Sequence, residues 1–296
     1  MRWGMSVAMV PPEELAGLVR LAEQVGFDFV SLPDSVFYPQ HVSGGYPFAP
    51  DGKRMWAPET PMPDPLVTVA ALAAVTTRIR FQTNVLKLPL RAPLLLAKQV
   101  ATLAVLSDDR LSLGVGVSWM PEEFRFTRTD MRTRGARTDE AIEILRLVCG
   151  GSGPAWVEHH GRHYDFDRLM VSPAPARPVS ILVGGHSDAA LRRAARLGDG
   201  WVAANVPLAE LEAALDRLAE LRRAEQRPED RPEDRPFSVC VAPVGIGDAD
   251  GFRHLESAGV TDVYLAPWRL YGHAHGDRAA RLESVRRFAA EVIDRC

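Results

Sequence analysis

A Gly-Gly turn at positions 184 and 185 has the composition of a phosphate-binding loop. An apolar run, residues 179–183, precedes the turn and predicts a buried strand. His186 follows the turn, and Ser187 is of a type that caps helix N-termini. Because a helix N-terminus offers unpaired N–H groups and the positive end of a dipole, the turn could hold a phosphate. A turn that merely redirects the chain is the alternative, since neither G-x-G-x-x-G nor G-K-[ST] occurs here.

Polar and small residues stand at the ends of three further predicted strands. Asp34 follows the second strand, where a barrel enzyme places site residues, although an Asx turn is the alternative. Thr83 and Asn84 interrupt the third strand, and buried polar groups of this kind need a ligand or a backbone partner. Gly116 and Ser118 end the fourth strand. Small residues there leave room for a flat ring or a phosphate, or they accommodate bulky neighbours in the barrel.

Histidines supply the remaining candidate chemistry. His41 lies in the long segment after the second strand and is the nearest group that could move a proton near neutral pH. A solvated loop position is the alternative for it. The segments HHGRHY (159–164) and YGHAH (271–275) lack the Cys or carboxylate spacing of a metal site, so we expect no metal.

The elements that must position these residues alternate along the whole chain. About eight strand–helix units predict an α/β protein of the (β/α)8 barrel class, formed as a single domain over residues 1–296. A doubly wound sheet is the alternative, but it usually has fewer units. Two insertions, Pro33–Pro63 and Cys149–Arg177, are expected at the C-terminal face of the barrel or around its rim. The charged repeat Arg227–Pro236 is expected to be a solvated connector. The predicted strands are Trp3–Val10, Asp28–Leu32, Ile79–Leu86, Leu111–Val117, Val179–Val183, Trp201–Ala204, Phe237–Val244 and Val260–Leu265.

Composition excludes several classes of partner. The formal net charge is −3, which predicts neither a nucleic-acid surface nor an anionic-membrane surface. No apolar run approaches the ~20 residues that span a bilayer, and the N-terminus does not resemble a signal peptide. The three cysteines are odd in number and widely spaced, so we expect a reducing, cytoplasmic location.

Two blocks of the sequence together resemble the luciferase-like monooxygenase superfamily. They are Thr77–Phe124 and Pro178–Trp201, and the phrase AEQVGFD at 22–28 also fits. The resemblance implies a TIM barrel that binds FMN or the deazaflavin F420 at its C-terminal mouth, and it implies a homodimer. The segments TNVL (83–86) and LPLR (88–91) make the chain more similar to the F420-dependent branch.

The resemblance also assigns roles to individual positions. It implies that Asp34 and Ser35 border the cofactor ring. It places Asn84-Val85 where the family often has a non-prolyl cis peptide bond that supports one face of the ring. The turn from Gly184 to Ser187 matches the segment that holds the cofactor phosphate.

The sequence also departs from the family pattern. Ser35 stands where many members have His, and Trp119 stands where the sugar-phosphate dehydrogenase branch has a glutamate acid. Ser118 and Asp109 replace two usual glycines. The reaction of that dehydrogenase branch is therefore not transferred to this chain.

We expect an oxidoreductase that moves a hydride between coenzyme F420 and a small-molecule substrate. An FMN-dependent monooxygenase using reduced flavin and O2 is one alternative, and a barrel that binds a flavin-like ligand without turnover is another. The substrate walls are expected among Phe37, Tyr38, His41, Trp56 and Trp119. The candidate catalytic residues are Asp34 and His41, and the candidate cofactor-binding residues are Asp34, Ser35, Thr83, Asn84, Val85, Gly116, Ser118, Gly184, Gly185, His186 and Ser187.

Overall fold

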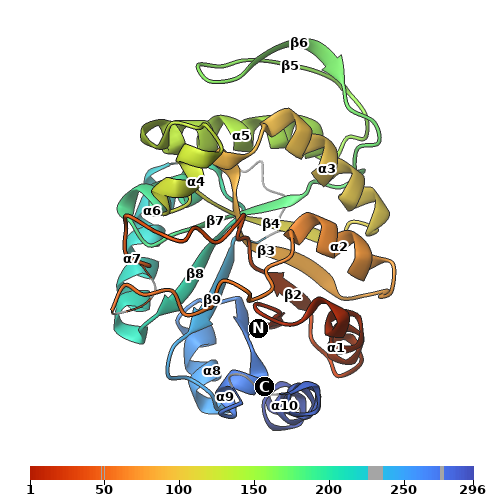
Figure 1. Ribbon diagram of the computed structural model, residues 1–296, viewed down its shortest axis with the longest axis vertical. Helices are drawn as coiled ribbons and strands as arrows, with labels where there is room; N and C mark the ends of the chain where they lie inside the picture. Colours follow the sequence, from red (N-terminus) through yellow and green to blue (C-terminus); the bar gives the residue numbers. More distant parts are fainter. Residues whose placement is uncertain (48, 50, 226–235, 274–276) are drawn as a thin grey trace.

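Parallel strands close into a barrel in the computed structural model, with helices packed around it (Figure 1). The structure describes residues 1–47, 49, 51–225, 236–273 and 277–296. Within them the barrel has eight strands in the order β1-β10-β9-β8-β7-β4-β3-β2, which confirms the predicted (β/α)8 class. The strands are β1 (Arg2–Ser6), β2 (Phe29–Leu32), β3 (Arg80–Lys87), β4 (Leu111–Gly116), β7 (Ser180–Gly184), β8 (Gly200–Val206), β9 (Ser238–Pro243) and β10 (Asp262–Leu265).

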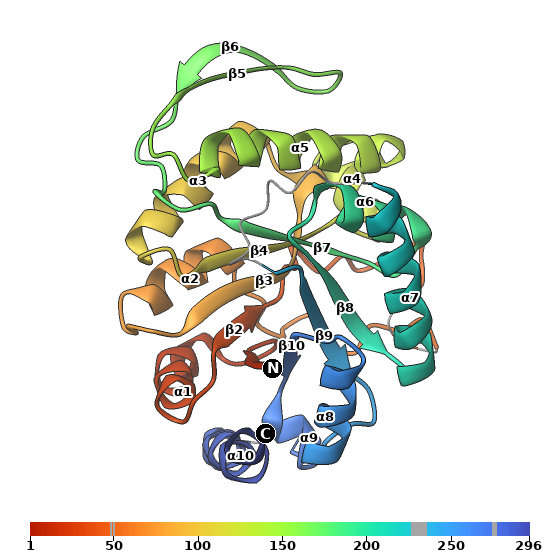
Figure 2. The ribbon, with the colours of Figure 1, turned by 180° about the vertical axis from the view of Figure 1, so that it is seen from behind.

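Helices follow the strands and form the outer layer of the molecule (Figures 1 and 2). Two short helices were not predicted from the sequence: α4 (Pro121–Phe126), which follows β4, and α9 (Pro267–Leu270), which follows β10. The helices are α1 (Pro12–Gln24), α2 (Pro65–Ala73), α3 (Pro93–Leu106), α4 (Pro121–Phe126), α5 (Arg134–Cys149), α6 (Asp188–Leu197), α7 (Leu208–Ala224), α8 (Ala249–Ser257), α9 (Pro267–Leu270) and α10 (Arg278–Glu291).

Local sequence explains where several helices begin. Proline opens α1, α2 and α3, where its missing N–H removes no helical bond. Asp64 caps α2 by accepting hydrogen bonds from the N–H groups of Leu66 at 2.9 Å and Val67 at 3.1 Å. Ser187 caps α6, as the sequence predicts. The prolines and caps therefore set the residue at which each of these helices begins. They thereby set the length of the loop before it.

Two apolar clusters hold the barrel and its helices together. The larger cluster fills the space between strands and helices. The smaller one consists of Phe29, Leu182, Val202, Cys240 and Tyr264, all on barrel strands. Val85 and Ala242 pack against this second cluster near the carboxyl ends of their strands. It therefore forms a floor beneath the mouth of the barrel.

The two insertions lie at different places. The first follows β2 and so starts at the carboxyl ends of the strands, as predicted. The second follows α5 and precedes β7, and it contains an antiparallel hairpin of β5 (Trp156–His160) and β6 (Asp165–Met170). Figures 1 and 2 show this hairpin outside α5 and α3, away from the barrel strands. Of the two predicted positions, the C-terminal face is wrong, because a segment that follows a helix starts at the opposite end of the barrel, and the hairpin lies around the outer helices.

Side-chain contacts keep the hairpin on the outer helices. The carboxylate of Glu140 on α5 accepts hydrogen bonds from the backbone N–H groups of Arg162, His163 and Tyr164. Lys98 on α3 donates to the carbonyl of Ser172 beyond the hairpin. The histidines of the HHGRHY segment therefore belong to this outer hairpin and not to the mouth.

The predicted connector at 227–235 and His275 of the YGHAH segment lie outside the described residues. Among the residues that are described, no helix is both long enough and apolar enough to cross a membrane.

Candidate active site

The carboxyl end of β3 is irregular, and this irregularity shapes the mouth of the barrel. The peptide bond between Asn84 and Val85 is cis, which confirms the expectation drawn from the resemblance. The pairing of β3 with β4 shifts register between Thr83 and Leu86. Val85 is half-buried and lies at the top of the apolar floor. The chain thus presents an apolar side chain to the centre of the mouth.

Glycines on the neighbouring strands make room for Val85. A Cβ atom on Gly116 would lie 2.6 Å from Val85 Cγ2, and one on Gly184 would lie 2.7 Å from Val85 Cγ1. Such distances are far shorter than normal contacts, so only glycine fits at both positions. The two glycines therefore leave space for the Val85 side chain. For Gly116 this is the packing role that was the alternative prediction.

A polar network lies beneath this platform inside the barrel. The Gln82 amide donates to Asn84 Oδ1 at 2.8 Å and to Cys240 Sγ at 3.2 Å. Asn84 Nδ2 in turn donates to Ser31 Oγ at 2.8 Å. Both polar atoms of the Asn84 side chain therefore form hydrogen bonds inside the barrel. Thr83 is fully buried and its hydroxyl donates to a β4 carbonyl at 2.8 Å, so any cofactor contact at this position would come through its backbone.

Asp34, at the start of the first insertion, is held by an arginine. Arg91 donates to both of its carboxylate oxygens, at 2.7 and 2.9 Å, and the Lys87 backbone N–H donates to Oδ2 at 2.9 Å. The Asp34 side chain is 2% exposed and that of Arg91 is 17% exposed. Bidentate pairs of this kind are strong and directional. The contact ties the insertion to the end of β3, and the predicted catalytic role of Asp34 stays a prediction.

A second buried ion pair lies beside the first. Lys87 Nζ bonds to Glu123 Oε1, and their side chains are 10% and 0% exposed. The Ser118 hydroxyl donates to Glu123 Oε2 at 2.5 Å, and Ser118 has a positive φ of 60°. The ion pair therefore joins the end of β3, the loop after β4 and α4. Ser118 uses its hydroxyl hydrogen on this pair, so it could meet a cofactor only as an acceptor or through its backbone.

The predicted phosphate turn leads directly into the N-terminus of α6. Gly185 has a φ of 120°, a region that other residues rarely enter. Ser187 Oγ accepts from the Ala190 N–H at 3.3 Å, while the N–H groups at the very start of an α-helix have no helical partner. The Asp188 carboxylate in this first turn is bound by Arg192 at 2.6 Å and Arg217 at 2.8 Å. An anion approaching α6 therefore meets N–H groups and a compensated carboxylate.

His186 in the same turn is held against β8. Its Nε2 accepts a hydrogen bond from the Ala204 N–H at 3.3 Å, and its ring lies 6.5 Å from that of Trp201. Burial of the ring nitrogens lowers the pKa of His186, and Glu210 opposes this shift. The neutral ring is consistent with its role as an acceptor. Trp201 Nε1 also donates to the Gly185 carbonyl at 2.8 Å, which fixes the turn.

Residues of the first insertion and Trp119 form a pocket of about 330 Å³, which we call the loop pocket. Aromatic rings form much of its wall, and Tyr46 packs against Trp119 with ring centroids 5.5 Å apart. Burial raises the pKa of Tyr46, and Arg269 opposes the shift. The lining residues are Tyr38, Val42, Gly44, Tyr46, Gly52, Lys53, Arg54 and Trp119.

The loop pocket contains only some of the predicted substrate walls. Tyr38 and Trp119 line it, and their role as substrate walls stays a prediction. Trp56 contacts Tyr46 at 5.1 Å between ring centroids, and Phe37 packs instead against Phe126 of α4. His41 is exposed and does not line the pocket. Ser35 is half-buried next to Asp34.

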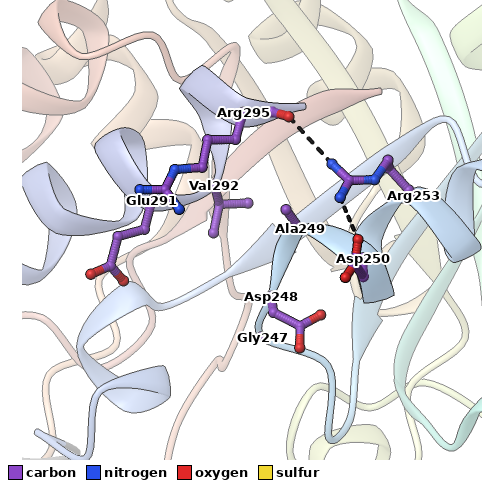
Figure 3. A pocket seen from close by; sticks show the side chains of 8 residues that line it. All are labelled: Gly247, Asp248, Ala249, Asp250, Arg253, Glu291, Val292 and Arg295. Atoms are coloured by element: carbon purple, nitrogen blue, oxygen red, sulfur yellow. Dashed lines mark hydrogen bonds and ion pairs between the residues drawn. The ribbon is translucent and has the colours of Figure 1, made fainter.

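Another hollow, of about 580 Å³, lies in the outer helical layer (Figure 3). It is formed by the start of α8 and the chain that follows α10. Arg253 in this hollow bonds to Asp250 and to the Arg295 carbonyl, the latter at 3.3 Å. None of the residues from the strand ends lines it, so it is not part of the mouth.

Sequence reasoning missed several residues that shape the mouth. Lys87 and Glu123 were not considered, although a lysine at the end of an apolar strand is a signal that a partner lies nearby. Arg91 was noted only as part of a motif. Arg54 gave no signal, because it lies in an irregular segment without periodicity.

Comparison with known proteins is consistent with this geometry. A model of the luciferase-like monooxygenase family matches residues 2–244. An uncharacterised protein of Mycobacterium tuberculosis is 38% identical over 296 residues, covering 99% of each chain. An F420-dependent glucose-6-phosphate dehydrogenase of Beutenbergia cavernae is 31% identical over 220 residues, covering 73% of this chain and 60% of that protein.

Solved structures show the same fold. The coenzyme F420-dependent tetrahydromethanopterin reductase of Methanopyrus kandleri aligns with a TM-score of 0.70 at 15% identity over 99% of each chain. A monooxygenase from Streptomyces bottropensis aligns with a TM-score of 0.68 at 20% identity, covering 100% of this chain and 99% of that one. The family match covers most of the barrel and the mouth that it forms. The chain therefore belongs to the luciferase-like monooxygenase family and is an oxidoreductase of that class.

Proposed function

We propose that this protein transfers a hydride between coenzyme F420 and a small organic substrate. The observation that carries the proposal is the platform at the mouth, where the half-buried Val85 stands between Gly116 and Gly184. A planar ring can lie on such an apolar platform. The turn after β7 begins at Gly184, so a phosphate carried on the side chain of the ring can reach the start of α6.

The residues of the chain would bind and orient the cofactor. Val85 would support one face of the ring, while the turn from Gly184 to Ser187 would hold the phosphate. When bound, F420 supplies the hydride chemistry, and the protein supplies orientation and an environment that excludes water. The Asp34–Arg91 and Lys87–Glu123 pairs would position the loops around the ring. They keep the strand ends fixed because each joins two or more separate segments.

The choice of F420 over FMN rests on sequence similarity. The relatives named F420-dependent glucose-6-phosphate dehydrogenase are 31% identical to this chain. The segment TNVL with LPLR also favours the F420-dependent branch. Both cofactors carry a phosphate, so the turn after β7 would accept either one.

A paired titration tests the proposal. The purified protein is titrated with F420 and with FMN, and the ligand fluorescence is followed in each case. We expect tighter binding of F420. Tighter binding of FMN, together with oxygen uptake in the presence of reduced FMN, would contradict the proposal and support a flavin monooxygenase. Tight F420 binding without hydride transfer to any of a panel of substrates would support a barrel that only binds the cofactor.

We also propose that the protein forms a homodimer through α2 and α3. Three large apolar side chains on these helices are strongly exposed: Val67 at 71%, Leu95 at 69% and Leu106 at 68%. Large exposed apolar side chains on two helices in contact are expected at an interaction surface. Light scattering after size exclusion should give twice the chain mass, and Leu95→Glu should give the monomer. A monomeric wild-type protein at micromolar concentration would contradict this.

A further inference from the structure

The guanidinium group of Arg54 in the loop pocket lacks a full set of partners. Its Nη2 donates to the Pro39 carbonyl at 2.9 Å, and its carbon lies 3.4 Å from the centre of the Tyr38 ring. Its Nη1 is buried and has no hydrogen-bond partner among the described residues. A buried donor on a charged group is costly to leave unpaired, so such a group commonly marks a site for a ligand.

No carboxylate compensates Arg54 within the part of the chain that the structure describes. Arg54 forms no ion pair with Asp or Glu there. Arg91, which follows β3, instead pairs with Asp34 and Asp64. The neighbouring Lys53 is exposed and lies 3.9 Å from Asp51. Glu122, on the other side of the insertion, accepts a hydrogen bond from the Ser43 N–H at 3.0 Å. Arg269 acts on Tyr46 electrostatically and adds a further positive charge near the pocket.

The rest of the pocket wall is suited to a flat organic group. Tyr46 and Trp119 meet at 68° with ring centroids 5.5 Å apart, so they form an aromatic corner. Tyr38 covers one face of the Arg54 guanidinium. A volume of about 330 Å³ suits a small molecule. Trp119 follows the end of β4, which places the pocket beside the mouth where the cofactor ring is proposed to lie.

We propose that the loop pocket binds a planar organic carboxylate, with its carboxylate on Arg54 and its flat part against Tyr46 and Trp119. This inference rests on the proposed function in one respect only, because it places the bound carboxylate beside the proposed cofactor ring. The binding itself needs no cofactor. Arginine is the residue that recognises a carboxylate through two parallel hydrogen bonds, and Nη1 supplies the first of these.

Binding of cinnamate tests the proposal, with cinnamamide as the neutral compound of the same shape. Isothermal titration is carried out on the cofactor-free protein and on the protein saturated with F420. We expect cinnamate to bind at least about tenfold tighter than cinnamamide, as one charge-assisted hydrogen bond implies. Arg54→Met should remove this preference, and Arg54→Lys should keep part of it. Arg132→Met, at an exposed arginine that does not line the pocket, is the matched control and should keep the wild-type preference.

Each outcome decides the inference. Equal binding of the two compounds, or an Arg54→Met variant with the wild-type preference, would overturn it. Failure of both compounds to bind would also overturn it, since the pocket would then take no planar ligand of this size. Circular dichroism and thermal melting show whether a variant is folded. If F420 does not bind but cinnamate does, the proposed function fails while the carboxylate site stands.

Discussion

The buried pair of Lys87 and Glu123 provides the sharpest test of how the mouth is held together. Glu123→Gln removes the negative charge but keeps the size of the side chain. The Lys87 ammonium, only 10% exposed, is then left without its counterion, and the Ser118 hydroxyl loses a charged acceptor. Removing one partner of a buried ion pair costs about 3–5 kcal/mol. At about 2–4 °C per kcal/mol for a large domain, the melting temperature should fall by roughly 6–20 °C.

A double-mutant cycle measures the coupling between the two groups. Unfolding of the wild type, Lys87→Met, Glu123→Gln and the double variant is followed by circular dichroism in urea and by heating. Because Lys87→Met in the Glu123→Gln background removes the stranded ammonium, the double variant should be more stable than Glu123→Gln alone. The coupling energy should reach at least about 2 kcal/mol, within the range found for residues in contact.

A surface arginine gives the matched control. Arg132 pairs with Asp130 at 3.1 Å, but its side chain is 90% exposed. Arg132→Met should leave the melting temperature unchanged within error, because water screens such pairs. The reasoning would be refuted if Lys87→Met and Glu123→Gln acted additively, or if either change were as mild as Arg132→Met.

Three further predictions follow from single positions. Gly114→Ala should destabilise the protein by about 1–3 kcal/mol, because the new Cβ would lie 2.1 Å from a backbone carbonyl oxygen of β3. Gly17→Ala within α1 should instead stabilise the protein slightly, and urea unfolding of both variants measures the difference. Cys240 should resist a maleimide reagent in the folded protein while Cys296 reacts, since full burial raises the pKa of the Cys240 thiol and Cys296 is exposed; mass spectrometry of the labelled protein checks this, and labelling of Cys240 in folded protein would contradict it. Asp64→Ala should cost about 1 kcal/mol by removing the cap of α2, and a loss too small to measure would show that the cap is dispensable.

The candidate site could be predicted where a local pattern carries the information. The glycines at 184 and 185, the cap at Ser187 and the strand before them are neighbours in sequence, so their conformations follow from backbone preferences, while their phosphate-binding role stays a prediction. The cis bond at Asn84-Val85 was expected from the resemblance, since no local rule indicates a cis bond without proline. For the hairpin at 156–170 the C-terminal-face alternative was wrong, because the end of α5 from which it starts lies at the opposite end of the barrel.

The sequence by itself determined the alternation of strands and helices, the barrel class and the turn that ends β7. These depend on periodicity and on the residues at chain turns, which act over a few positions. Only the tertiary structure decided that Arg91 binds Asp34, 57 residues away, and that Lys87 binds Glu123, 36 residues away. Closure of the barrel brings the ends of different strands together, so the partners of a charged side chain at the mouth are set by the fold. The same reason explains why Arg54, in a segment without a repeating pattern, could be recognised only once the pocket around it was known.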